Sequence, residues 1–126
     1  MYFNASKKFT NIEVVACSDI IPERSKAKFE AHGVPNMTND ELFAIPEIEI
    51  VLNLTPPQVH SKIAMDTLNA GKHAYSEKPF GVDADDAAKV VALAQKKVHT
   101  KTSITTDRIL PRGYWARTVK SAVEAD

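Results

Sequence analysis

The chain has 126 residues, of which 44% are hydrophobic and 25% are charged, and its formal net charge at pH 7 is +0. Such a composition is ordinary for one globular domain, and a neutral chain lacks the basic face that nucleic-acid or membrane-surface partners require. The single cysteine, Cys17, excludes an internal disulfide, and neither a signal peptide nor an apolar run near the ~20 residues of a membrane span occurs, so we expect a soluble, cytoplasmic protein.

The first predicted unit is a strand followed by a helix. Residues 12–20, IEVVACSDI, are rich in β-branched side chains and predict a buried strand. Pro22 suits the first position of a helix and Gly33 suits the position after its last residue, so residues 22–33 predict a helix. A short extended piece, residues 34–37, is expected next.

A second strand–helix unit occupies the middle of the chain. The spacing of Thr38 and Glu41 predicts a capping box that starts a small helix through Ile45. Residues 47–54, EIEIVLNL, predict a strong strand, and residues 58–72 predict a helix that stops at a glycine.

The last predicted elements are a strand over residues 73–78 and a helix over residues 83–97, which Asp83 caps. Apolar residues of that helix follow the 3.6-residue period and predict its buried face: Ala87, Val90, Val91 and Ala94. Residues 98–106 predict a fourth, less apolar strand, and residues 107–126 predict a tail with one helix.

Alternation of strands and helices at this spacing predicts the α/β class, with a Rossmann-like, doubly wound parallel sheet and helices on both of its faces. In such sheets ligands bind beyond the carboxyl ends of the strands. The residues at those ends are polar or proline-rich: Ser18 and Asp19, residues 53–57, residues 76–79 and residues 105–108. We expect these strand ends to line a single crevice.

Asp19 ends the first predicted strand and has two interpretations. A carboxylate at this place accepts both hydroxyls of an adenosine ribose in dinucleotide-binding sheets. The same position lets the side chain cap the following helix, and the sequence leaves the two interpretations open. Arg24, one turn into the helix, is interpreted as a solvated charge rather than as a ligand of a 2′-phosphate.

The strand over residues 47–54 ends in Thr55-Pro56-Pro57. Thr55 suits the N-cap of the next helix with a proline near N1, which is by itself a sufficient structural reason for the motif. A functional alternative is that the turn presents backbone groups to a flat ring. His60 either faces the crevice or is an ordinary surface or packed residue, and the histidines share no spacing that indicates a metal site.

The stretch YSEKPFG places Glu77, Lys78 and Pro79 at the end of a strand. A lysine at this place can hydrogen-bond a substrate hydroxyl or a nicotinamide carboxamide, and Glu77 would hold it in place. The structural alternative is a surface ion pair, which contributes little stability. Pro79 indicates a shaped turn, and we hypothesise a cis peptide bond between Lys78 and Pro79.

The chain from about residue 11 to about residue 97 resembles the Gfo/Idh/MocA family, which is named for glucose–fructose oxidoreductase, inositol dehydrogenase and rhizopine catabolism. The resemblance rests on ordered motifs: a strand ending in Asp19, D-E-L before a strand, T-P-P-x-x-H, A-G-K-H and E-K-P. It implies an NAD(P)-dependent dehydrogenase of a sugar, polyol or related hydroxy compound, built from a Rossmann domain and a second α/β domain.

The resemblance also implies a catalytic lysine, Lys78, beside the nicotinamide and the substrate. It implies cofactor-binding residues at matching positions, with Asp19 for the ribose and a second group formed by Thr55, Pro56, His60, Glu77 and Pro79. The match weakens past Lys97, where Arg108 and Pro111 correspond to an arginine and a proline that the family often has.

Two elements of the family are missing. The four glycines form no G-x-G-x-x-G loop, whose amides hold the pyrophosphate at a helix N-terminus. Counting back from Asp19 places that loop before Met1, so residues 2–9 would be the end of the first helix. We expect the second domain of the family to be absent from this chain as well. We expect residues 1–106 to form a partial NAD(P)-binding Rossmann domain without its first strand, and residues 107–126 to lead toward an absent domain.

The missing strand would lie between residues 12–20 and 47–54 and would leave unpaired edges inside the sheet. We expect that the chain is a fragment of a longer protein, that its sheet re-pairs around the gap, or that a homo-oligomer or partner chain fills it. The leading interpretation is a partial NAD- or NADP-dependent oxidoreductase that is inactive alone. The alternative is a non-catalytic remnant or interaction module that keeps the fold and binds no cofactor.

Overall fold

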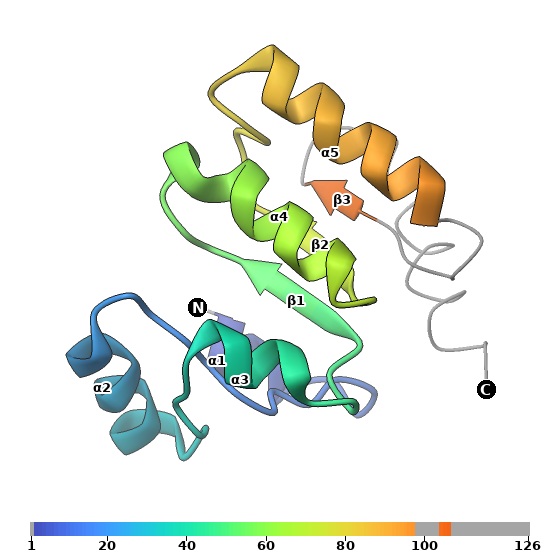
Figure 1. Ribbon diagram of the computed structural model, residues 1–126. Coiled ribbons are helices and arrows are strands. Elements are labelled where there is room, and N and C mark those ends of the chain that lie inside the picture. Colours follow the sequence, from blue (N-terminus) through green and yellow to red (C-terminus); the bar gives the residue numbers. More distant parts are fainter. Residues whose placement is uncertain (1, 98–103, 107–126) are drawn as a thin grey trace. The chain divides into compact units, whose positions relative to one another are not determined.

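The computed structural model describes residues 2–97 and 104–106, and it divides into two compact units (Figure 1). The N-terminal unit comprises Met1–Ile48 and the C-terminal unit comprises Glu49–Asp126. No helix within the described ranges is long and apolar enough to cross a membrane. The predicted tail helix lies outside the described residues, and so do Arg108 and Pro111, the two residues matched to the family past Lys97.

The N-terminal unit contains α1 (Tyr2–Ser6), α2 (Pro22–His32) and α3 (Asn39–Ala44). Helix α2 has Pro22 at its first position and ends at Gly33, whose φ is 73° and whose N–H donates to the carbonyl of Phe29 at 2.7 Å. A left-handed residue at this place suits glycine, which has no Cβ, so both predicted ends of α2 are confirmed.

Helix α3 starts with the predicted capping box. The side-chain oxygen of Thr38 accepts from the N–H of Glu41 at 3.3 Å, and the Glu41 carboxylate accepts from the N–H of Thr38 at 2.8 Å. These two bonds satisfy backbone donors that an α-helix leaves open at its first turn.

The predicted strand over residues 12–20 is wrong. Only Cys17 pairs, in an isolated parallel bridge with Asn36; its N–H donates to the carbonyl of Pro35 at 2.9 Å, and its carbonyl accepts from Met37 at 3.0 Å. Ile12 is 50% exposed, although a buried position was expected. A β-branched run becomes a strand where a neighbour pairs along its length, and here pairing is confined to one residue.

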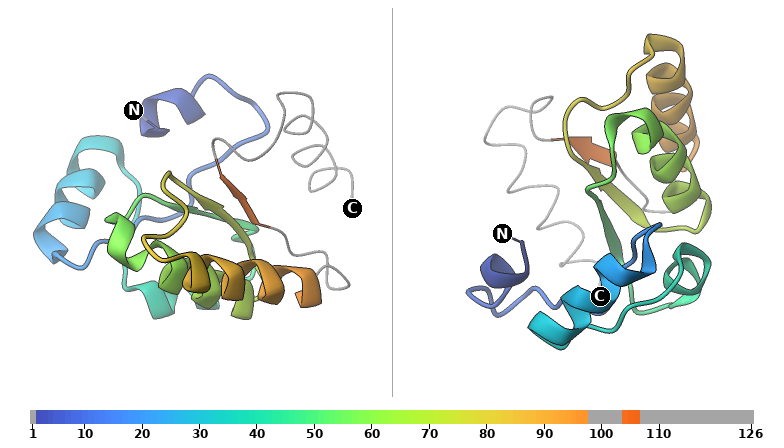
Figure 2. Two further views of the ribbon diagram at one scale, coloured as in Figure 1. Left: turned by 90° about the horizontal axis from the view of Figure 1, so that it is seen from above. Right: turned by 90° about the vertical axis from the view of Figure 1, so that its left-hand side faces the viewer.

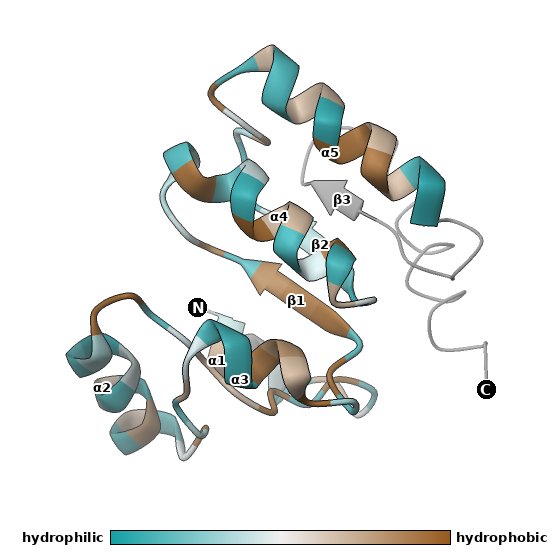
Figure 3. Cartoon of the chain, in the orientation of Figure 1, coloured by the Kyte–Doolittle hydropathy of each residue, from teal (hydrophilic) through white to brown (hydrophobic). Residues whose placement is uncertain are grey.

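The C-terminal unit holds a parallel sheet in the order β1-β2-β3, with β1 at Ile50–Asn53, β2 at His73–Ser76 and β3 at Ile104–Thr106. None of these strands comes from residues 12–20, so the direct re-pairing that was one of three alternatives is absent from this sheet. Strand β1 is hydrophobic up to its last residue, Asn53, whereas α2 carries mainly hydrophilic residues (Figure 3).

Helices α4 (His60–Asn69) and α5 (Ala84–Lys97) pack against each other and lie on one face of this sheet (Figure 2). We expected helices on both faces of the sheet, and the described helices of this unit cover one face. Between the helices and the sheet lies the hydrophobic core, formed by Ala64, Leu68, Ala74, Val90 and Ala94.

Two details of these helices differ from the sequence prediction. A short 3₁₀ helix, η1 (Pro57–Val59), precedes α4, and Thr55 is not an N-cap because its hydroxyl donates to Asn53 Oδ1 at 2.7 Å. In α5, Val91 is 43% exposed instead of buried. The cap of α5 is confirmed, since Asp83 Oδ1 accepts from the N–H of Asp85 at 2.7 Å.

Candidate functional site

The carboxyl ends of the three strands meet at one edge of the sheet. Asn53 at the end of β1 is in register with Ser76 at the end of β2, and Ser76 is in register with Thr106 at the end of β3. The turns that follow β1 and β2 therefore leave from the same edge. This confirms the expectation for the strand ends of the C-terminal unit, where ligands of parallel sheets bind.

A buried polar network joins these strand ends. Asn53, which is 2% exposed, donates through Nδ2 to the carbonyl of His60 at 3.0 Å and to Ser76 Oγ at 3.1 Å. Its Oδ1 accepts from the hydroxyl of Thr55 at 2.7 Å and from the N–H of Thr55 at 3.3 Å. Buried polar atoms are retained where they are hydrogen-bonded, so this network fixes the two turns relative to the sheet.

Sequence reasoning marked the ranges that contain Asn53 and Ser76 but assigned neither residue a role. The available signal was a polar residue at the last position of an otherwise apolar strand, as in IVLN and HAYS. Such a residue faces the helix layer at the carboxyl edge, where it can bond the turns that follow.

His60 opens α4 and is 1% exposed. Its Nδ1 lies 2.6 Å from the carbonyl oxygen of Pro79, and its Nε2 lies 2.6 Å from the carbonyl oxygen of Thr55. Of the two interpretations left open by the sequence, the structure agrees with a packed histidine. A direct contact with a cofactor stays a prediction.

The turn after β2 contains Glu77, Lys78 and Pro79, and the Lys78–Pro79 peptide bond is cis, as hypothesised. The Glu77 carboxylate accepts from the backbone N–H of Lys78 at 3.3 Å. The side chain of Lys78 is exposed, and its ammonium has no ion-pair partner among residues 2–97. The surface ion pair that we considered as an alternative is therefore absent from this turn.

Thr55 and Pro56 lie in the turn after β1. Thr55 is half-buried, and both its hydroxyl and its N–H donate to Asn53 Oδ1; Pro56 is exposed. The turn is thus fixed at Thr55 and exposed at Pro56.

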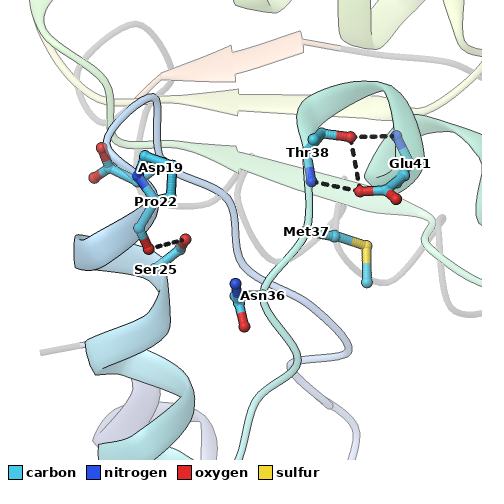
Figure 4. A pocket seen from close by; sticks show the side chains of 7 residues that line it. All are labelled: Asp19, Pro22, Ser25, Asn36, Met37, Thr38 and Glu41. Atoms are coloured by element: carbon cyan, nitrogen blue, oxygen red, sulfur yellow. Dashed lines mark hydrogen bonds between the residues drawn. The ribbon is translucent and has the colours of Figure 1, made fainter.

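In the N-terminal unit, Asp19 is exposed and lies in a pocket of about 260 Å³, lined by the seven residues of Figure 4. Its Oδ1 accepts from the N–H of Ile21 at 2.9 Å. Because Ile21 precedes the first residue of α2, Asp19 shapes the approach to the helix and does not cap it. Ile20, next to Asp19, is 96% exposed.

Glu41 lines the same pocket, and the hydrogen bonds from the backbone and side chain of Thr38 lower the pKa of its carboxyl below the ordinary value. Burial raises the pKa of the Cys17 thiol, and Lys28 partly opposes this shift. These two shifts have structural causes, a helix cap and a half-buried thiol.

The remaining shifts lie in the C-terminal unit. Burial lowers the pKa of His73, and the carboxylate of Glu49 partly opposes that shift. The hydrogen bond from Lys89 to Asp86 raises the pKa of the lysine. None of these groups is at the carboxyl edge of the sheet, because His73 begins β2 and Lys89 lies within α5.

The sequence matches a known family over most of its length. Residues 1–104 match the Gfo/Idh/MocA family, described as an oxidoreductase family with an NAD-binding Rossmann fold. Inositol 2-dehydrogenase of Salmonella typhimurium is 30% identical over 108 residues, which are 83% of this chain and 32% of that protein. An uncharacterized oxidoreductase of Schizosaccharomyces pombe is 38% identical over 91 residues, which are 70% of this chain and 25% of that protein.

A solved structure supports the same relation. The crystal structure of the WlbA dehydrogenase from Chromobacterium violaceum, in complex with NADH and UDP-GlcNAcA, superposes with a TM-score of 0.75 at 26% identity. The superposition covers 83% of this chain and 30% of that chain. The chain therefore spans about a quarter to a third of the length of these relatives.

Proposed function

The chain belongs to the Gfo/Idh/MocA family of NAD(P)-dependent oxidoreductases, and from this we propose that it contributes to the cofactor-binding domain of a dehydrogenase. The substrate class proposed is a sugar, a polyol or a related hydroxy compound, and the likeness to inositol 2-dehydrogenase supports it. The observation that carries the proposal is the edge where Asn53, Thr55 and Lys78 gather at the carboxyl ends of parallel strands.

In the N-terminal unit, Asp19 would bind the adenosine ribose. Its carboxylate is exposed, and the bond from Ile21 engages only Oδ1, so Oδ2 is left for a ribose hydroxyl. Exposed Ile20 would offer an apolar surface to the adenine ring. These features fit the ribose end of a dinucleotide, whereas the sequence offers no glycine-rich loop for the pyrophosphate.

In the C-terminal unit, the turn with Thr55 and Pro56 would border the nicotinamide half of the cofactor. Glu77 and Pro79 would shape the turn that presents Lys78. The exposed ammonium of Lys78, with three N–H donors, would orient or polarise the oxygen of the substrate or the carboxamide of the ring. When bound, NAD(P) supplies the hydride acceptor at nicotinamide C4, and the protein supplies orientation and charge.

Fluorescence titration with NADH, NADPH and ADP-ribose tests this proposal on the 126-residue chain. Asp19→Asn keeps an oxygen that accepts from Ile21 but removes the charge, so we expect it to weaken NADH and ADP-ribose by about tenfold or more and not to weaken NADPH, whose 2′-phosphate a carboxylate repels. Asp40→Asn is the matched control, because Asp40 lies on α3 and does not line the pocket.

Lys78→Ala tests the other end of the cofactor. We expect it to weaken NADH and to leave ADP-ribose, which has no nicotinamide, unchanged. Binding that appears only after an N-terminal segment with a glycine loop is added would assign the deficit to the missing loop. Absence of binding in that longer chain as well would overturn the proposal and favour the non-catalytic module.

A further inference from the structure

We propose that His60 is a positioning residue that fastens the turn carrying Lys78 to the turn carrying Thr55. The purpose assigned to Lys78 rests on the function proposed above. The His60 bridge is defined as the two contacts of its ring, Nδ1 with the carbonyl of Pro79 and Nε2 with the carbonyl of Thr55, each at 2.6 Å.

The bridge spans segments that are far apart in the sequence. Thr55 lies five residues before His60 and Pro79 lies nineteen residues after it. Carbonyl oxygens only accept, so a ring with a proton on each nitrogen donates to both turns, and a ring with one proton donates to one. With its ring buried against two carbonyl oxygens, His60 has no ring nitrogen left for a ligand.

Lys78 is held on both sides of its own backbone position. Before it, the N–H of Glu77 donates to the carbonyl of Asn53 at 3.1 Å; after it, the carbonyl of Pro79 meets His60. The side chain between these two points is exposed. A fixed backbone beneath an uncommitted ammonium is what a residue requires to meet a ligand at a defined place.

Two further contacts seat the same turn on α4 and the core. Phe80 packs against the hydrophobic core, and a Cβ added at Gly81 would lie 2.6 Å from Ser61 Oγ, so the backbone at Gly81 passes close to the first turn of α4. These contacts hold the far end of the turn. The polar bridge from His60 fixes its middle, directly beside Lys78.

An apolar residue would fill the buried site of His60 without the desolvation cost of two ring nitrogens. The backbone of His60 is itself held in place, because Asn53 Nδ2 donates to the carbonyl of His60. His60 therefore connects the end of β1, through Asn53, with the turn after β2, through Pro79.

Hydrogen exchange of backbone amides tests the bridge without any ligand. His60→Leu removes both polar contacts, and we expect exchange at the amides of Thr55 and Glu77 to rise by about tenfold. His60→Gln retains one donor group and is expected to give an intermediate rise. Thr67→Val is the control, because it removes a buried hydroxyl bond within the same helix, from Thr67 to Ile63, at a distance from both turns.

The NADH affinity of the single and double variants distinguishes a positioning role of His60 from a general effect on stability. If His60 acts through Lys78, His60→Leu weakens NADH about as much as Lys78→Ala does, and the double variant loses no more than Lys78→Ala alone. A NADH affinity that falls additively in the double variant, or equally in Thr67→Val, would overturn the positioning role.

The two proposals fail in different ways. A wild-type chain that binds no NADH, with or without an added N-terminal segment, contradicts the proposed function. Exchange at Thr55 and Glu77 in His60→Leu that equals wild type contradicts the bridge, whatever the chain binds. Solution NMR of the ring adds a direct sign: the bridge predicts a ring N–H that exchanges slowly with water, and fast exchange would reject it.

Discussion

The two units place their apolar side chains differently. In the C-terminal unit Leu68 and Val90 are fully buried between the helices and the sheet. In the N-terminal unit Ile48 is the one buried hydrophobic residue among those described, whereas Ile12 and Phe29 are about half exposed. Both units have capped helices, so a capped helix does not by itself produce a buried core. A core requires that apolar side chains from other segments pack against the helix.

The short polar hydrogen bonds that fix loops and turns differ between the two units in the same sense. In the N-terminal unit the capping box joins Thr38 with Glu41, three residues away, and Asp19 bonds Ile21, two residues away. In the C-terminal unit Asn53 reaches Ser76 and His60 reaches Pro79, over 23 and 19 residues. Contacts over long separations make unfolding cooperative, so the C-terminal unit is expected to respond more strongly to single changes.

The largest expected effect is a cavity in the core. Leu68→Ala should lower the free energy of unfolding of the C-terminal unit by about 2–5 kcal/mol, because the residue is fully buried against the sheet. Val15→Ala, in the N-terminal unit and exposed, is the matched control and should change it by less than about 0.5 kcal/mol. Urea denaturation measures both. Equal losses would erase the contrast between the units.

The polar network gives the next largest effect. Asn53→Ala leaves Ser76 and the carbonyl of His60 without their amide donor and should cost about 1–3 kcal/mol. Asn69→Ala, at the exposed end of α4, serves as the comparison variant. Thermal unfolding would show the difference as a lower Tm for Asn53→Ala, and an unchanged Tm would mean that the network adds no stability.

A smaller effect is expected at the capping box of the N-terminal unit. Thr38→Ala should lower the stability of α3 by about 1 kcal/mol and raise amide exchange within that helix only. Thr38→Ser keeps the accepting hydroxyl and should behave as wild type. Exchange that rises throughout the C-terminal unit instead would show that the two units are not separate in their stability.

The smallest effect concerns pH. Burial lowers the pKa of His73 below its ordinary value of 6.5, so as the pH falls below 6.5 the unfolded chain binds a proton before the folded chain does. The C-terminal unit should therefore lose stability from pH 6.5 downward until the folded imidazole is protonated too. His73→Gln should remove this slope, and a slope that persists would assign it to another group.

Glu41 provides the contrasting window. Its pKa lies below the ordinary 4.5, so its contribution to the N-terminal unit is present above pH 4.5 and is lost as the pH falls through the folded pKa. Exchange measured by region should thus show the C-terminal unit weakening at a higher pH than the N-terminal unit. Glu41→Gln, which retains the cap, should abolish the lower window.

Features that depend on a few neighbouring residues were predictable from the sequence. The ends of α2, the capping box of Thr38 and the cap of α5 are of this kind. The gathering of strand ends was predictable as well, because parallel strands joined by helices must place their carboxyl ends at one edge.

Features that depend on competing partners were not predictable. Residues 12–20 have the composition of a strand, but pairing along a strand is set by a neighbour and reaches only Cys17. Thr55 is a residue type that suits an N-cap, but its hydroxyl donates to Asn53 Oδ1 instead of accepting from a helix N–H. The role of His60 depends on two carbonyls that the folded chain brings together, and no spacing in the sequence reveals that geometry.

Cys17 gives the N-terminal unit a built-in chemical reporter. The thiol is half-buried beside the carbonyls of Ser25 and Val34, and burial raises its pKa, so little reactive thiolate is present at neutral pH. It is also the single cysteine of the chain. The rate at which a maleimide attaches therefore reports changes in the burial of this thiol, one labelling event per molecule, with no engineered residue required.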